Sequence, residues 1–462
     1  MTLRIIGIDL AVHAAHKAVI LDQASQRFLS GLISFRANPA EMDCLLQQAR
    51  AGATDEVQLI AVLEATGMSW FTVGTYLVRH GVRVYRVSGQ LTADQRRVIQ
   101  RHAKSDRIDA RVLVSLYLAC PERLRPLFLP SGPQLELQRA CRELQRLTRQ
   151  IASIKNRLLA TDALAWLGLA DVLPPYGPQA RWVRTHWYDP WRVREAGYAT
   201  LAQAWQDAAP QQPADTAWIE GLLRKAKEVV ALYGQPQRLD YQCLQLGLQR
   251  EQARLESAEE QAQTLRLGTI RPLYRQLHPQ RHLETLRGVG QDSAAVYVAF
   301  IGDIHRFPSL ADFRGWSGLI PYSRQSGTAQ AQGLRITQAG PDLVKSTAFL
   351  DANVARLYDP QIAAIYQAQM LRGKHHLQAL CACATHLLDR VYTVLRENRP
   401  YELRDPRGQP LDKEQARRLC TQVYRVPPEV RRRNNYRLRK ARAEQRVEQR
   451  YQSRALKERS KG

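Results

Sequence analysis

Two aspartates stand three residues apart in HAKSDRIDARVL, residues 102–113. Positions i and i+3 are neighbours on a helix, so Asp106 and Asp109 would repel each other unless a positive charge lay between them. Two more acids end apolar runs that predict strands, Asp9 in LRIIGID and Glu64 in VQLIAVLE. If these strand ends share one sheet edge and the helix packs against it, the four carboxylates lie close together.

Such a cluster predicts a metal site, because four adjacent carboxylates do not all stay ionised without a counterion. Mg²⁺ suits hard oxygen ligands, with Mn²⁺ as the alternative, and two such ions can flank a scissile phosphate. Any one of the acids alone would be read as a strand-end or surface residue. An actin-like ATPase is disfavoured because AVHAAH, and not a Gly/Thr-rich phosphate turn, follows the first strand.

A second candidate for chemistry is the loop PYSRQSG, residues 321–327. A serine in an exposed loop can act as a nucleophile if its deprotonation is made easier, and a nearby metal site could do this. Ser326 is the candidate, with Ser323 and Tyr322 as the next choices. A nuclease that uses water would need the acids but not the serine.

The elements that position these residues divide the chain into four predicted regions. Residues 1–125 show three successive strands, a helix and then strand–helix–strand, which indicates a mixed sheet flanked by helices. Residues 126–278 contain two heptad-like stripes, typical of a coiled-coil oligomer interface or of a helical hairpin within one subunit. Residues 279–405 are predicted to be mainly helical, and residues 406–462 form a basic extension.

Composition points to a nucleic-acid partner. The chain of 462 residues has 67 Lys+Arg against 43 Asp+Glu, a formal net charge of +24. This surplus favours a polyanion, because contacts to phosphates release condensed counterions. The seven cysteines are scattered without a zinc spacing, no apolar run reaches membrane-spanning length, and a prokaryotic cytoplasmic location is expected.

The chain resembles the transposases of insertion-sequence family one-ten, the bridge-RNA-guided recombinases that include Piv-type DNA invertases. The matching pieces are GIDLA, LEATG, KSDRIDARVL and the run from LRGVGQDSAAVYVAFIGD to PYSRQSG. The chain departs from the family after the serine, where TQAGPDLVKS replaces a Lys–Gly–Asn-type stretch followed by Arg. By position, the family's four acids and its catalytic serine fall on Asp9, Glu64, Asp106, Asp109 and Ser326.

The resemblance implies a RuvC-like domain of the RNase H fold, a coiled-coil middle and a mainly helical transposase domain that carries the serine. It implies a tetramer, built as a dimer of dimers, in which one subunit's acids work with another's serine. The implied partners are double-stranded donor and target DNA and a structured non-coding guide RNA. The residues expected to contact nucleic acid are Lys104, Arg107, Arg324, Gly327 and Arg335.

The sequence therefore predicts a Mg²⁺-dependent DNA recombinase that exchanges strands through a covalent phosphoserine intermediate. The alternative is a RuvC-like metal-dependent nuclease, a junction resolvase or an RNA-processing enzyme, with water as its nucleophile. A third hypothesis is a non-catalytic RNA-binding scaffold.

Overall fold

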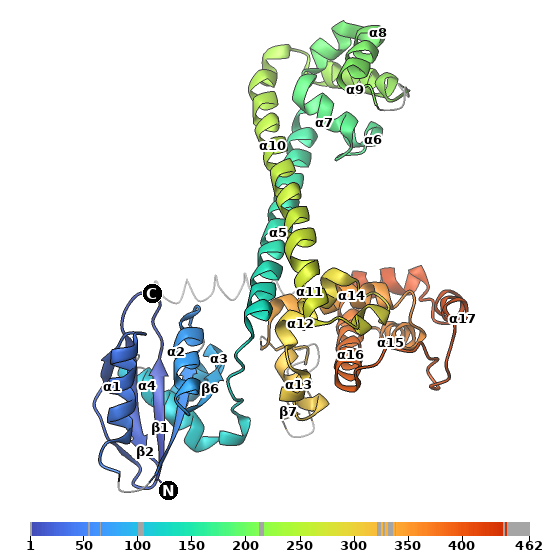
Figure 1. The fold of residues 1–462 in the computed structure, drawn as a ribbon. Coiled ribbons are helices and arrows are strands. Elements are labelled where there is room, and N and C mark those ends of the chain that lie inside the picture. Colours follow the sequence, from blue (N-terminus) through green and yellow to red (C-terminus); the bar gives the residue numbers. More distant parts are fainter. Residues whose placement is uncertain are drawn as a thin grey trace, which may run out of the picture. The chain divides into compact units, whose positions relative to one another are not determined.

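The chain divides into two units, Met1–Ser131 and Gly132–Gly462 (Figure 1). In this computed structural model, the described residues are 2–53, 56–64, 66–99, 106–211, 217–320, 325–326, 329–330, 336–337, 339–437 and 439–440. Within this part of the chain, no helix is long and apolar enough to cross a membrane.

The first unit is built on a six-stranded mixed sheet with the order β3-β2-β1-β5-β6 and with β4 paired to β2. The strands are β1 Thr2–Asp9, β2 His16–Asp22, β3 Arg27–Phe28, β4 Ile33–Phe35, β5 Val57–Glu64 and β6 Arg83–Val87. Strand β1 runs antiparallel to β2 and parallel to β5, which runs parallel to β6. The mixed sheet predicted from the sequence is confirmed.

Helices cover both faces of this sheet, which explains why β1 and β5 are near-continuous apolar runs. The helices of this unit are α1 Pro39–Arg50, α2 Ser69–Arg79, α3 Gly89–Ile99 and α4 Asp106–Ala119. Ile6 and Ile8 of β1 pack in one core with residues of α1 and α2. Ile5 of β1, together with Ile60 and Val62 of β5, packs in a second core with α4. Alternate residues of a strand therefore face opposite helices.

Helix α4 approaches β1 closely at Gly7. A Cβ atom added at Gly7 would lie 2.1 Å from the carbonyl oxygen of Ala110 and 2.8 Å from Cγ2 of Val114. No residue with a side chain fits there unless the helix moves. Because Gly7 stands two residues before Asp9 and Ala110 directly follows Asp109, this contact sets the distance between the predicted acids.

The second unit begins with a pair of long helices, α5 Gly132–Ala165 and α10 Tyr241–Leu265, which run antiparallel along each other (Figure 1). Residues of both apolar stripes are buried, among them Leu158 of α5 and Leu255 of α10. The Lys155 Nζ atom lies 2.7 Å from Oε1 of Glu259 across the pair. The structure thus pairs the two stripes within one chain. This is the helical hairpin that was one of the two interpretations of the heptad-like pattern.

Four helices at the far end of this hairpin form a core rich in tryptophan. They are α6 Leu169–Val172, α7 Pro178–His186, α8 Pro190–Ala208 and α9 Ala217–Tyr233. Trp182 packs edge-on against Trp205 and Trp218. Arg184 is ion-paired with Asp162 of α5, and both residues are buried. The Pro- and Trp-rich stretch is therefore a small core that closes the hairpin.

The remaining helices of the second unit include the apolar helix α12, which is buried from Ala294 to Ile301 and shares one core with residues of α11, α13, α14, α15 and α16. They are α11 Arg271–Leu277, α12 Gln291–Ile301, α13 Leu310–Ser317, α14 Asp342–Ala355, α15 Pro360–Leu371, α16 His376–Glu397 and α17 Lys413–Arg418. Two short strands, β7 Gln325–Ser326 and β8 Ala329–Gln330, pair between α13 and α14. Burial raises the pKa of the Cys383 thiol in α16 to about 12, as befits a core thiol.

We expect Gly7→Ala to destabilise the first unit by roughly 3 kcal/mol, because the new methyl group overlaps the backbone of α4. Hydrogen–deuterium exchange of the full-length protein should show faster exchange in peptides from β1 and α4. Gly31→Ala is the matched control, since a Cβ there meets nothing within 4 Å. Equal protection in the two variants would contradict this role of Gly7.

Candidate active site

Two of the predicted acids lie side by side at one edge of the sheet. Ile8 of β1 pairs with Leu63 of the parallel strand β5, so Asp9 and Glu64 come next in register at the carboxyl ends of adjacent strands. By strand alternation, both belong to the face that α4 covers. In α/β sheets, functional side chains commonly lie at the carboxyl ends of parallel strands.

The other two acids come from the first turn of α4, where Asp106 is exposed and Asp109 is 8% exposed. The pKa of Asp9 is raised to about 6, first by burial and then by the negative charges of Asp109, Asp106 and Glu64. The structure therefore brings the four predicted carboxylates close enough to act on one another. Their mutual repulsion is what a divalent cation would relieve.

A positive side chain that sequence reasoning missed sits beside these acids. Arg96 of α3 places its Nε atom 2.5 Å from Oδ1 of Asp109, and its charge lowers the pKa of Asp9, opposing the other influences. The sequence required a cation near Asp106 and Asp109. It gave no signal to choose Arg96 over Arg97, because that choice depends on how α3 packs on α4.

The N-terminus of α3 lies beside Glu64. A Cβ atom added at Gly89, the first residue of α3, would lie 2.9 Å from Oε1 of Glu64. Helix N-termini carry a partial positive charge that stabilises anions. A larger residue at position 89 would require the Glu64 carboxylate to shift.

The donor set fits a hard divalent cation, since it consists of carboxylates; burial first, and then repulsion among these acids, raises the pKa of Asp9. Among the described residues, however, no three His, Cys, Asp or Glu side chains are arranged as a closed set of metal ligands. One oxygen of Asp109 is engaged by Arg96. The predicted acids are therefore gathered, but they do not form a finished coordination shell.

The predicted nucleophile lies in the second unit, where Ser326 of β7 pairs with Ala329 of β8. Its side chain lies outside the described part of the structure. Of the predicted nucleic-acid contacts, Arg107 is exposed on α4. The others lie outside the described residues, namely Lys104, Arg324, Gly327 and Arg335.

The two ends of the segment that contains Ser326 are joined at its base. The backbone N–H of Thr337 donates to the carbonyl of Ile320 at 2.9 Å, and Thr337 Oγ1 donates to the carbonyl of Gly318 at 3.0 Å. A Cβ atom at Gly318 would lie 1.8 Å from the carbonyl oxygen of Ala339. This close approach requires glycine, and Gly318 also has a φ of +71°.

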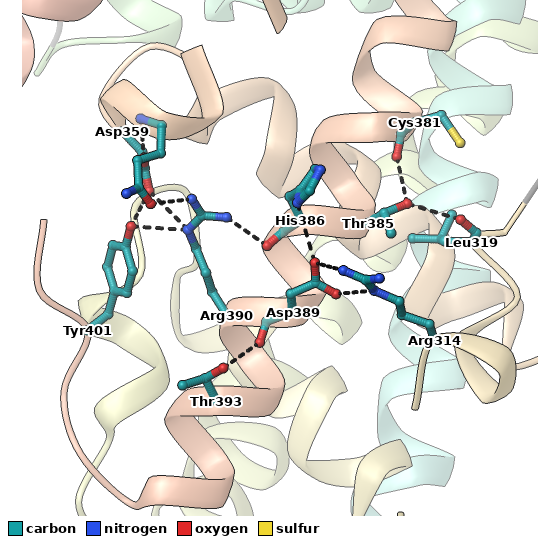
Figure 2. Close-up of polar contacts among 11 residues, drawn as sticks. Arg314, Leu319, Asp359, Cys381, Thr385, His386, Asp389, Arg390, Thr393 and Tyr401 are labelled. Atoms are coloured by element: carbon teal, nitrogen blue, oxygen red, sulfur yellow. Dashed lines mark hydrogen bonds and ion pairs between the residues drawn. The ribbon is translucent and has the colours of Figure 1, made fainter. Parts of the chain in front are cut away.

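Helix α16 braces the first of these two ends (Figure 2). Arg314 of α13 donates two hydrogen bonds to Asp389, at 2.7 and 2.6 Å. Thr385, one turn earlier on α16, donates to the carbonyl of Leu319 at 3.0 Å. The bidentate ion pair is part-buried, so it fixes the orientation of α13 against α16.

Comparison with known proteins adds independent findings. A family model for DEDD transposases of the IS110 type matches residues 6–162, and one for the transposase IS116/IS110/IS902 family matches residues 280–367. The chain belongs to the IS110 family of transposases. The two matched ranges include all four acids and Ser326. As an IS110-family transposase, the protein is a recombination enzyme that acts on DNA.

Individual relatives agree with this family. The uncharacterized 43.6 kDa protein of insertion element IS110 from Streptomyces coelicolor is 28% identical over 66% of this chain and 74% of its own length. The uncharacterized 44.8 kDa protein of insertion element IS116 from Streptomyces clavuligerus is 23% identical over 85% of this chain and 95% of its own length. The pilin gene-inverting protein of Moraxella lacunata is 28% identical over 26% of this chain and 38% of its own length.

We expect Asp9, in the protein without divalent ions, to contribute a loss of stability as the pH rises from about 4 to about 6. The folded state holds the Asp9 proton more tightly than the unfolded chain, because its pKa is raised from 3.8 to about 6. Asp9→Asn should flatten this part of the curve of melting temperature against pH and raise the melting temperature at neutral pH. Asp94→Asn, an exposed acid on α3, should keep the slope of the parent. Identical curves for the parent and Asp9→Asn would contradict the conclusion that burial and the neighbouring acids raise the pKa of Asp9.

Proposed function

We propose that this transposase is a divalent-metal-dependent recombinase that uses Ser326 as its nucleophile. The observation that carries the proposal is the convergence of the four carboxylates Asp9, Glu64, Asp106 and Asp109 at one sheet edge. We assign the acids to a catalytic domain of residues 1–125, the helical middle to 126–278, the serine to 279–405 and the basic extension to 406–462.

The strand order and directions support a RuvC-like domain of the RNase H fold. Three antiparallel strands, β1 to β3, are followed by β5 and β6, which lie on the other side of β1 and run parallel to it. Acids at the ends of β1 and β5 and on a helix that packs on β1 are the arrangement expected of that fold from the resemblance. The tight contact at Gly7 keeps the helix in place.

The four carboxylates would hold Mg²⁺, with Mn²⁺ as the alternative. A bound divalent ion supplies positive charge near the scissile phosphate and lowers the pKa of a coordinated hydroxyl or water. The chain adds Arg96, whose guanidinium lies next to Asp109 and supplies a fixed positive charge to the same edge. The burial of Asp109 and the partial burial of Asp9 reduce the screening of these charges by water.

A serine nucleophile suits a reaction that must end with resealed DNA. The Ser326 oxygen forms a bond to phosphorus while the bond from phosphorus to one deoxyribose oxygen breaks. The serine proton passes to water, and the departing oxygen takes up a proton. The phosphoserine keeps the energy of the phosphodiester, so the reverse reaction can join a new strand without ATP. A relative named for inverting a pilin gene supports rejoining as part of the function.

We infer that a structured guide RNA and a tetrameric assembly complete the system. The net charge of +24 supports binding of more than one polyanion. Base pairing by a guide RNA would read the donor and target sequences, leaving the protein to hold backbone and shape. In a dimer of dimers, the acids of one subunit would act with Ser326 of another.

A second candidate function is a RuvC-like nuclease with water as its nucleophile. The acids favour it, because a metal-binding carboxylate cluster is sufficient for hydrolysis. Such an enzyme would leave free phosphate ends without attached protein. The two candidates therefore differ in whether Ser326 is required.

Ser326→Ala should abolish a covalent protein–DNA adduct and lower strand exchange by about 10³-fold or more, because the attacking oxygen is lost. Denaturing gels of the full-length protein with labelled donor and target DNA measure both. Ser346→Ala, an exposed serine of α14, is the matched control and should behave like the parent. Unchanged strand exchange by Ser326→Ala would reject the serine, while cleavage without an adduct in the parent protein would favour water.

Chelation of divalent ions with EDTA should stop adduct formation, and added Mg²⁺ should restore it, because charge at the acidic edge must be neutralised. Asp109→Asn should lose adduct formation by about 10²-fold or more under the same conditions. Asp94→Asn should retain it. Full activity in EDTA would reject the metal-dependent mechanism.

A further inference from the structure

Positively charged side chains gather at the start of α16. Arg356, the residue after α14, stacks its guanidinium over the ring of Tyr366 with 4.7 Å to the ring centroid. The Tyr366 hydroxyl lies 2.7 Å from Nδ1 of His376, the first residue of α16. Arg431, on the helix of residues 428–437, acts electrostatically on all three. We call the two arginines, Arg356 and Arg431, the cation cluster; the His376 imidazole beside them is uncharged at neutral pH, because its pKa is lowered to about 4.

The helix of residues 428–437 is held firmly in this position. Asn434 is buried, and its Nδ2 atom donates to the carbonyl oxygens of Met370 at 2.7 Å and Lys374 at 3.0 Å. Val430, one turn before Asn434, packs against the core of the second unit. The backbone N–H of His376 donates to Oδ1 of Asn435 at 3.4 Å. Arg431 and Asn435 are also one turn apart, so they lie on the same side of this helix.

The cation cluster has no balancing acid among the described residues. No carboxylate in that part of the chain is ion-paired with Arg356, with Arg431 or with His376. The pKa of His376 is lowered to about 4, first by burial and then by the positive charges of Arg431, Arg356 and His375. Arg356 is half-buried and Arg431 is exposed, and neighbouring charges of one sign are unfavourable unless a counterion joins them.

Neighbouring arginines of the same unit show the opposite arrangement (Figure 2). Arg390 lies 3.6 Å from the buried carboxylate of Asp359, and Arg314 is paired with Asp389. The small cavity of about 130 Å³ beside α16 is lined by Arg390 and two further arginines, each of which pairs with a glutamate. Those arginines are each paired with a carboxylate of the same unit. Among the described residues, no carboxylate is paired with the cation cluster in this way.

We propose that the cation cluster binds a phosphate group of a nucleic-acid backbone. Guanidinium groups match the oxygens of a phosphate, and the partial burial of Arg356 strengthens its contact by reducing screening. The first turn of α16 adds the positive end of a helix dipole. The inference rests on the proposed function only in taking nucleic acid as the partner. DNA and RNA share this backbone chemistry, and separate probes distinguish them.

The test compares Arg431→Gln with Arg432→Gln in the full-length protein. Both residues are exposed on the same helix, but Arg432 lies beside Glu429 at 3.9 Å. Fluorescence anisotropy with a labelled DNA duplex and with a labelled RNA hairpin gives affinity against NaCl concentration. Arg431→Gln should weaken binding of at least one probe about tenfold at physiological salt and make the logarithmic salt slope shallower by about one. Arg432→Gln should change affinity less than about twofold.

The probe that loses affinity identifies whether DNA, RNA or both occupy the cluster. Equal effects of the two substitutions, or no effect of Arg431→Gln on either probe, would overturn the proposal. Melting temperatures of both variants verify that the helix of residues 428–437 remains docked. The adduct assay with Ser326→Ala tests the proposed function on other residues, so the two failures are distinguishable.

Discussion

Repulsion among carboxylates is the constraint on which the first unit depends. Asp9, Glu64 and Asp109 approach one another only because apolar packing places the ends of β1, β5 and α4 at one edge. The packing energy of a buried apolar core outweighs the electrostatic cost of this arrangement. Arg96 and the start of α3 reduce that cost without removing it. The fold therefore holds these acids in positions where the binding of a cation would be favourable.

In the second unit, packing brings positive charges together instead of negative ones. There, Asn434 and Val430 hold a helix whose Arg431 faces Arg356 and His376. Apolar packing and amide hydrogen bonds again bring like charges together. A local cluster of carboxylates in one unit and a local pair of arginines in the other are suited to a polyanionic substrate and the cations that accompany it.

Much of this arrangement was readable from the sequence. Apolar runs that end in Asp9 and Glu64 predicted strands, and two such runs flanking a helix pattern predicted a shared edge. Because side chains alternate along a strand with a period of two residues, Asp9 and Glu64 fall on the same face of the sheet. Arg96 could not be chosen in advance, because α3 carries neighbouring arginines and its rotation against α4 is a tertiary property. The packing of Trp182 with Trp205 and Trp218 also depends on contacts between helices that sequence periodicity does not specify.

The base of the serine segment has an implication for how such enzymes diversify. Gly318 meets Ala339, and Thr337 bonds back to Gly318 and Ile320, so both ends are pinned at one point of the helical scaffold. Insertions or deletions between these anchors would leave α13 and α14 undisturbed. Evolution can thus alter the length and composition of that segment while the surrounding architecture stays constant.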